Sequence, residues 1–180
     1  MRVRWLALVA VVTIPLVLLP QSLPRSSFVV RLQYAKIDLP RSSSSSCLAI
    51  FPDGRFHMEQ SSDWPASAPR IFEDSLSGDS LRSLSSILDA RELRELRVVE
   101  PGLAKVAQGE VIWAIVPRQE GDQILAFTAL EGSGAQVAKP FPASLRPLVQ
   151  WVQVTTKALT QQKLRPLKKS KQVNCWLTKH

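Results

Sequence analysis

Residues 47–59 have the sequence CLAIFPDGRFHME, which predicts a β-hairpin. Proline sets φ at the first corner of the turn, and glycine accepts the positive φ that such turns require. An Asp-Gly pair between two strand-like runs is a strong short-range hairpin signal. In the second run, Phe56 and Met58 alternate with polar residues, as in a half-buried strand. The chain therefore contains at least one antiparallel pair of strands.

A helix is predicted to begin shortly after this hairpin. Ser77 is a favourable N-cap, and Asp79 lies in the first turn, where the helix dipole favours a carboxylate. Leu81, Leu84 and Leu88 follow at helical spacing and form one apolar stripe. We therefore expect this helix to pack against the sheet through its leucines.

A second hairpin is predicted further along the chain. The near-continuous apolarity of residues 111–116 indicates a central strand that is covered on both faces. Residues 119–122 form a turn, and residues 124–129 return as the partner strand. Residues 61–69 are predicted to be a loop and residues 70–73 a further strand.

A last helix is predicted to begin at Ser144. Its buried face has four residues at helical spacing, namely Leu148, Val152, Thr155 and Leu159. Residues 149–154 are rich in β-branched side chains, so a strand is the alternative. Together the elements predict an α+β fold, in which an antiparallel sheet of two hairpins plus one further strand is covered by two helices.

The length and composition limit the possible classes of protein. A chain of 180 residues fits one domain and is too short for an α/β barrel. An apolar fraction of 45% excludes wholesale disorder. The net charge of +8 is unevenly spread, because residues 1–45 contribute +5, residues 46–131 contribute −6 and residues 132–180 contribute +9. An anionic partner would therefore be attracted to the two ends of the chain.

The first 24 residues predict a hydrophobic helix that serves as a signal peptide or a membrane anchor. Two arginines precede 15 uncharged residues at positions 5–19, a pattern typical of export signals. A membrane-spanning helix needs about 20 apolar residues. The alternative to a cleaved signal peptide is therefore an uncleaved anchor formed by residues 5–23. A buried core helix is a third interpretation. For a signal or an anchor, the positive-inside rule places the rest of the chain outside the cytoplasm, either membrane-anchored or periplasmic or extracellular.

A linker is predicted between this segment and the folded domain. Residues 25–46 include five consecutive serines at 42–46, which offer little apolar surface to bury. The sequence leaves open whether residues 28–39 form a strand of the sheet. The α+β domain then spans residues 47–160, and a basic tail follows at 161–180.

The two cysteines, Cys47 and Cys175, predict a disulfide. An exported protein enters an oxidising compartment, and an even number of cysteines suits pairing. The bond would close a loop of roughly 130 residues and contribute about 4 kcal/mol in the chain-entropy model. Two free thiols or a bond between chains are the alternatives.

No motif predicts catalytic, cofactor-binding or metal-binding residues. The sequence lacks a Gly-rich phosphate loop, a nucleophile elbow and a paired-histidine motif, and its only histidines are His57 and His180. A Cys47 nucleophile with His57 as its base is one catalytic hypothesis. Pairing around the first turn instead places Cys47 opposite Glu59 and His57 closer to Ala49, so His57 is expected on the strand surface.

The basic tail predicts contact with an anionic surface. Its cations at residues 163–171 are Lys163, Arg165, Lys168, Lys169 and Lys171. Anionic lipid or another envelope polyanion is the expected partner, and a purely solvated tail is the alternative. Nucleic acid is not expected, because no reading motif or set of stacking aromatics accompanies these cations.

Three segments together resemble a known group of proteins. They are CLAIFPDGRFHMEQ at 47–60, RIFEDSLSGDSLRSLSSIL at 70–88, and SLRPLVQWV at 144–152 followed by NCW at 174–176. The order of these three segments is similar to that in small uncharacterised exported bacterial proteins, which are classed as domains of unknown function. The resemblance covers about residues 46–176. The resemblance implies an exported α+β domain and supplies no activity or cofactor.

These observations lead to one main hypothesis and two alternatives. The main hypothesis is an exported or membrane-anchored domain of the cell envelope that binds a partner without catalysis. The first alternative is a thiol-dependent enzyme that uses Cys47 and His57. The second is a nucleic-acid-binding protein that uses the basic tail.

Overall fold

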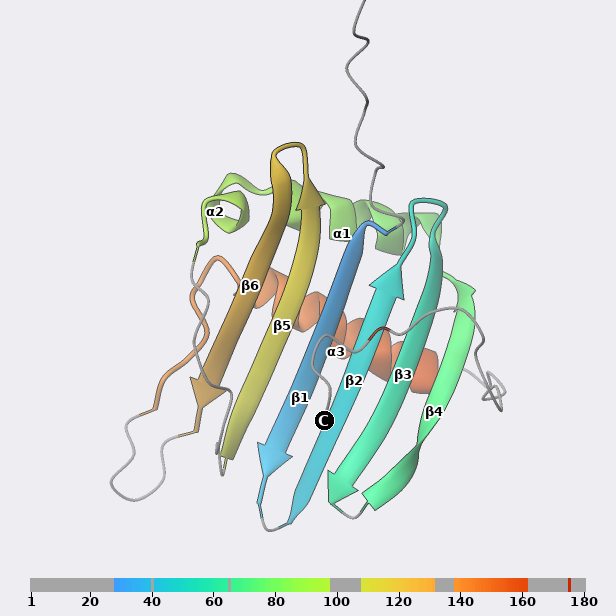
Figure 1. Cartoon of the computed structure of the whole chain (residues 1–180), viewed down its shortest axis with the longest axis vertical. Helices are drawn as coiled ribbons and strands as arrows, with labels where there is room; N and C mark the ends of the chain where they lie inside the picture. Colours follow the sequence, from blue (N-terminus) through green and yellow to red (C-terminus); the bar gives the residue numbers. More distant parts are fainter. Residues whose placement is uncertain are drawn as a thin grey trace, which may run out of the picture.

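Six antiparallel strands form one sheet in the order β4-β3-β2-β1-β5-β6 (Figure 1). The computed structural model describes residues 28–39, 41–64, 66–97, 108–131, 138–161 and 175. The strands are β1 (Val30–Asp38), β2 (Ser42–Ile50), β3 (Arg55–Trp64), β4 (Ala66–Ser75), β5 (Gln108–Arg118) and β6 (Gly121–Leu130). The helices are α1 (Gly78–Asp89), α2 (Arg91–Arg94) and α3 (Arg146–Gln161). The predicted α+β class is confirmed.

The first strand in the chain lies in the middle of the sheet. Strands β1 to β4 follow one another as a meander, and β5 then pairs with the other edge of β1, so that Ile115 lies opposite Arg31. The described residues thus form six strands instead of the predicted five. The additional strand is β1, whose inward side chains Val30 and Leu32 are fully buried.

The serine run lies in the first half of β2, which differs from the predicted linker. Strands β1 and β3 pair with it on both sides, so its backbone polar groups have partners. Ser45 is buried, and its Oγ lies 2.9 Å from the Oγ of Ser61. Tertiary pairing therefore overrides the weak strand propensity of serine. The loop predicted at residues 61–69 is likewise replaced by the adjoining ends of β3 and β4.

The helices α1 and α3 cover one face of the sheet (Figure 1). Ser77 caps α1 as predicted, because its Oγ accepts a hydrogen bond from the Ser80 backbone N–H at 3.2 Å. Ala90 separates α1 from α2, so the predicted two helices become three. The four residues predicted for the inner face of the last helix are buried in α3, which excludes the strand alternative.

The first hairpin has the predicted register. Cys47 pairs with Glu59, and Ala49 pairs with His57. Gly54 in the turn has φ +85°, a conformation that favours glycine. Strands β5 and β6 also pair as predicted, although β5 lies next to the edge strand and not at the centre of the sheet.

Two predicted segments lie outside the described residues. They are the signal or anchor at residues 1–24 and the basic cluster at residues 163–171. Among the helices that the structure describes, none is long and apolar enough to span a membrane.

Candidate functional site

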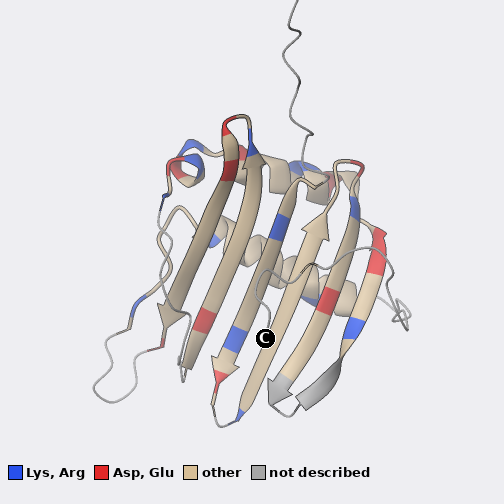
Figure 2. Ribbon diagram, in the orientation of Figure 1, with Lys and Arg blue, Asp and Glu red and all other residues tan. Residues whose placement is uncertain are grey.

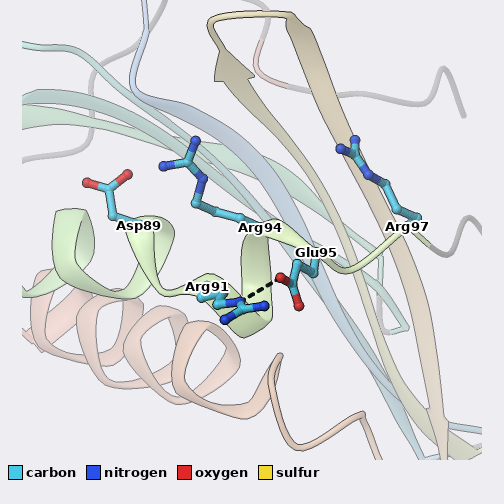
Figure 3. Close-up of a pocket in the computed structure, with 5 residues that line it drawn as sticks. All are labelled: Asp89, Arg91, Arg94, Glu95 and Arg97. Atoms are coloured by element: carbon cyan, nitrogen blue, oxygen red, sulfur yellow. Dashed lines mark hydrogen bonds and ion pairs between the residues drawn. The ribbon is translucent and has the colours of Figure 1, made fainter.

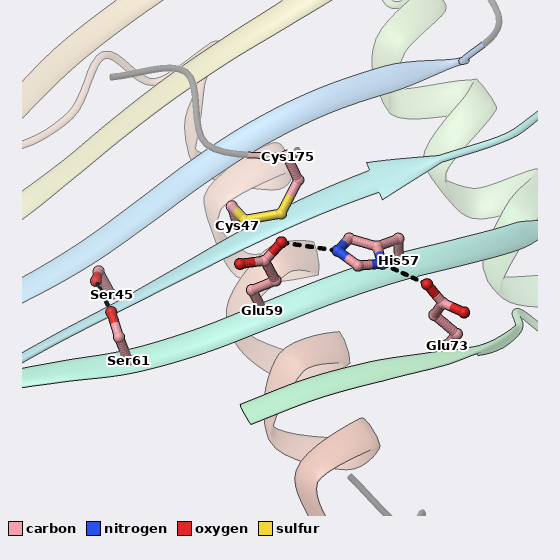
Figure 4. The surroundings of a disulfide bond; sticks show 7 residues. All are labelled: Ser45, Cys47, His57, Glu59, Ser61, Glu73 and Cys175. Carbon is pink, nitrogen blue, oxygen red and sulfur yellow. Dashed lines mark hydrogen bonds and ion pairs between the residues drawn. A yellow bond between two sulfur atoms is a disulfide. The ribbon is translucent and has the colours of Figure 1, made fainter. Parts of the chain in front are cut away.

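Several polar side chains gather on the face of the sheet that is opposite to α3 (Figure 4). Alternation along the strands directs Cys47 of β2 and His57 and Glu59 of β3 to this face. The register between β3 and β4 places Glu73 directly opposite His57. We call His57, Glu59 and Glu73 the histidine cluster.

Both ring nitrogens of His57 contact carboxylates. Nδ1 lies 2.7 Å from Oε1 of Glu73, and Nε2 lies 2.9 Å from Oε1 of Glu59. The His57 side chain is only 1% exposed, whereas that of Glu73 is 41% exposed. The predicted surface position of His57 is therefore wrong. A polar residue in an alternating strand faces away from the main core, but in this protein that second face is also covered.

The two contacts fix the position of the His57 ring between Glu59 and Glu73. Each ring nitrogen can donate or accept a hydrogen bond according to the tautomer, and each lies within hydrogen-bond distance of one carboxylate oxygen.

A disulfide joins Cys47 to Cys175 beside this cluster (Figure 4). The two Cα atoms are 5.6 Å apart, and both side chains are fully buried. The sequence predicts this pair, and the structure brings the two residues together. It does not bring Cys47 and His57 together as a catalytic pair, because Glu59 lies opposite Cys47 and the thiol is consumed in the disulfide.

A small cavity opens where the histidine cluster meets solvent. Its volume is about 280 Å³, and its charged and polar lining includes Arg55, His57, Glu73 and Asp74. The cavity is small compared with the pockets that enclose cofactors or drug-sized ligands. It exposes Glu73 to water and leaves His57 buried behind it.

An exposed group of arginines forms a second candidate site at α2 (Figure 3). A cavity of about 540 Å³ is lined by Asp89, Arg91, Arg94, Glu95 and Arg97, which we call the arginine pocket. Nε of Arg91 lies 2.7 Å from Oε1 of Glu95, so one of these arginines is paired within the pocket. Arg94 and Arg97 have no acidic partner among the described residues. Figure 2 places this mixed charge at one end of the sheet.

Side chains of the β5–β6 hairpin donate hydrogen bonds to the backbone of the segment that forms the arginine pocket. The Gln123 amide donates to the carbonyl oxygens of Leu93 at 2.8 Å and Leu96 at 3.0 Å, and its oxygen accepts from Arg118 at 2.7 Å. Arg118 also donates to the Leu88 carbonyl oxygen at 2.8 Å. These contacts hold the ends of α1 and α2 on the sheet.

The positive charges of the pocket act on Arg118. Its pKa is lowered mainly by burial and also by Arg94 and Arg97, whereas Asp89 raises it. Arg94 and Arg97 therefore act electrostatically on Arg118, and Asp89 offsets part of their effect. The three arginines of the pocket outnumber its two carboxylates, and this excess of positive charge favours an anion.

We expect the replacement Gln123→Leu to lower the free energy of unfolding by about 2 kcal/mol. Leucine would fill the space but would leave buried carbonyl oxygens and Arg118 without this partner. Equilibrium urea unfolding measures the change. The matched control is Ile124→Thr at the next residue, which is 43% exposed and should change stability by less than about 0.5 kcal/mol. Equal effects of the two replacements would contradict this role of Gln123.

A polar cavity of about 350 Å³ lies between the end of α3 and strands β1 to β3. Its hydroxyl groups include those of Tyr34, Ser44 and Thr156. The Gln153 amide donates to the Tyr34 oxygen at 2.8 Å, and burial raises the pKa of Tyr34. Tyr34 therefore stays neutral and acts as a hydrogen-bonding group of the helix–sheet interface.

Comparison with known proteins does not assign either site. No protein-family model matches the chain, and no curated protein sequence matches it. The predicted tail residues lie outside the described part of the chain. Sequence reasoning missed the histidine cluster and the arginine pocket, although three arginines within seven residues, at positions 91, 94 and 97, could have indicated a local concentration of positive charge.

Proposed function

We propose that the protein is an exported, non-catalytic binding domain of the cell envelope that takes an anionic ligand in the arginine pocket. The observation on which the proposal depends is the presence of Arg94 and Arg97 beside a cavity of about 540 Å³, with no acidic partner for either among the described residues. Guanidinium groups are well suited to phosphate and carboxylate oxygens, because their planar forks form paired hydrogen bonds.

Two independent features support export. The N-terminal sequence has the charge and apolar pattern of a signal peptide or anchor. The buried disulfide is compatible with an oxidising compartment, where such bonds persist. A resemblance to exported bacterial domains is a further reason for this proposal.

The described geometry supports binding in preference to thiol chemistry. A thiol-dependent enzyme needs Cys47 as a thiolate next to a base, whereas Cys47 is bonded to Cys175. Among the described residues, Glu59 has a carboxylate oxygen within 4.8 Å of both sulfurs, and His57 is not part of that group. The arginine pocket offers charge and exposure to a ligand, and the basic residues 163–171 would add further attraction to the same class of ligand.

Binding of a soluble polyanion tests the proposal. The probe is inorganic polyphosphate, titrated into the full chain in a neutral detergent at low salt and again at high salt. We expect Arg94→Ala/Arg97→Ala to weaken binding at low salt by about tenfold or more, since each surface cation contributes about 1 kcal/mol to such contacts. High salt should remove most of the difference.

The matched control is Arg82→Ala on α1, because Arg82 is exposed and already paired with Asp79. Its binding should remain within about twofold of wild type. A third variant without residues 163–171 separates the tail from the pocket. If the double arginine variant binds as wild type does, the pocket is not the ligand site, and a loss confined to the tail deletion would assign binding to the tail.

A further inference from the structure

The disulfide and Glu59 form a compact set of metal-ligating side chains. One ligand atom from each of Cys47, Glu59 and Cys175 lies within 4.8 Å of the other two. Both cysteines are fully buried, and the Glu59 side chain is only 13% exposed. The described residues thus bring two sulfurs and one carboxylate together from β2, β3 and the C-terminal region.

The side chains around this set hold Glu59 in place. His57 Nε2 lies 2.9 Å from Oε1 of Glu59, and His57 Nδ1 lies 2.7 Å from Glu73. Metal-ligating carboxylates and histidines in proteins have hydrogen-bond partners of this kind, which orient the ligand and tune its basicity. Glu73, His57 and Glu59 form a chain that ends at the sulfur atoms (Figure 4).

We propose that this cluster has a second chemical state, in which the reduced Cys47 and Cys175 bind Zn²⁺ together with Glu59. Zinc accepts thiolate sulfur and carboxylate oxygen in a tetrahedral arrangement, and three protein ligands leave a fourth position for water. Two thiolates favour zinc over magnesium or calcium, which prefer oxygen ligands only. In the disulfide state neither sulfur is a thiolate, so the two states exclude each other.

Conversion of the disulfide state into the zinc-binding state requires a reductant of the phosphine or dithiol class, which supplies the two electrons that break the S–S bond. A phosphine and one water convert the disulfide into two thiols and are released as the phosphine oxide. Zn²⁺ then displaces the two thiol protons, and both Cys–Zn bonds form without any further change in oxidation state. The Cα separation of 5.6 Å lets both cysteines reach one ion, because each Zn–S bond is about 2.3 Å long.

The metal would replace the disulfide as the link between Cys175 and the sheet. The inference does not depend on the arginine pocket or on the proposed anion binding. It requires only that the reduced chain keeps the register that places Glu59 opposite Cys47.

Cobalt substitution tests the proposal on the full chain. Co²⁺ is titrated into the phosphine-reduced protein, and thiolate-to-cobalt charge-transfer bands report sulfur ligation. We expect one ion per chain, with the visible bands of a tetrahedral site. Zn²⁺ should displace the cobalt and raise the Tm of the reduced protein, because the ion binds the folded state. The oxidised protein should show none of these bands.

Two variants distinguish a folded metal site that includes Glu59 from metal binding by the two cysteine thiols alone. Glu59→Gln should lower the cobalt affinity by at least about 10- to 100-fold, the loss seen when outer-shell partners are removed. The control Glu110→Gln changes a half-buried carboxylate on the helix face of the sheet and should bind as wild type does. The proposal is wrong if reduced wild type shows no thiolate–cobalt bands. It is also wrong if Glu59→Gln and Glu110→Gln bind equally, or if Zn²⁺ fails to raise the Tm.

Discussion

The double variant Cys47→Ala/Cys175→Ala is expected to lose about 4 to 5 kcal/mol of unfolding free energy. The disulfide joins residues that are 128 positions apart, and a bond of that span restricts the unfolded chain strongly. It also attaches Cys175 to a sheet face that buries Cys47 and Ala49. Equilibrium urea unfolding without reductant, with a chelator present to remove metal ions, measures the difference from wild type.

Reduction of the wild-type protein is the matched control for this variant. A phosphine breaks the same bond without changing any other group, so the urea midpoint should fall about as far as in the double variant. Adding phosphine to the double variant should change nothing. If the oxidised wild type and the double variant unfold at the same urea concentration, the bond contributes no stability and the prediction fails.

Local sequence signals predicted those parts of the fold that depend on neighbouring residues. The turn around Gly54 sets the pairing of β2 with β3, and the side chain of Ser77 sets the start of α1. Both features depend on backbone geometry within a few residues. The same is true of α3, whose apolar spacing predicted its buried face in spite of its β-branched residues.

Features that depend on distant partners could not be predicted in this way. The serine run becomes a strand because β1 and β3 enclose it, and no property of serine indicates those neighbours. His57 is buried on the same face of the sheet as Cys47 and Ala49, where Cys175 packs from far along the chain. Arg118 joins the surroundings of the arginine pocket through the β5–β6 hairpin, far along the chain from α2.

The second large effect is expected for His57→Ala, which should lower the free energy of unfolding by about 3 kcal/mol. The replacement removes two hydrogen bonds and leaves a cavity at a side chain that is 1% exposed. Most of the loss should come from Glu59, which is largely buried and loses its contact with the His57 ring. The Glu73 side chain is 41% exposed, so water can solvate its carboxylate when the contact with His57 is lost. Glu73→Gln should therefore lower the free energy of unfolding by less than about 1 kcal/mol.

A double-mutant cycle with Glu59→Gln tests this assignment of the loss. In wild type, Glu59→Gln replaces a carboxylate that contacts His57 and should be destabilising. In the His57→Ala background the same replacement changes a largely buried carboxyl group that has lost that contact, so it should be neutral or stabilising. Urea unfolding of the four proteins gives the coupling energy. An equal loss in both backgrounds would mean that His57 and Glu59 contribute independently, and the cost of His57→Ala would then arise from the cavity and the lost contact with Glu73.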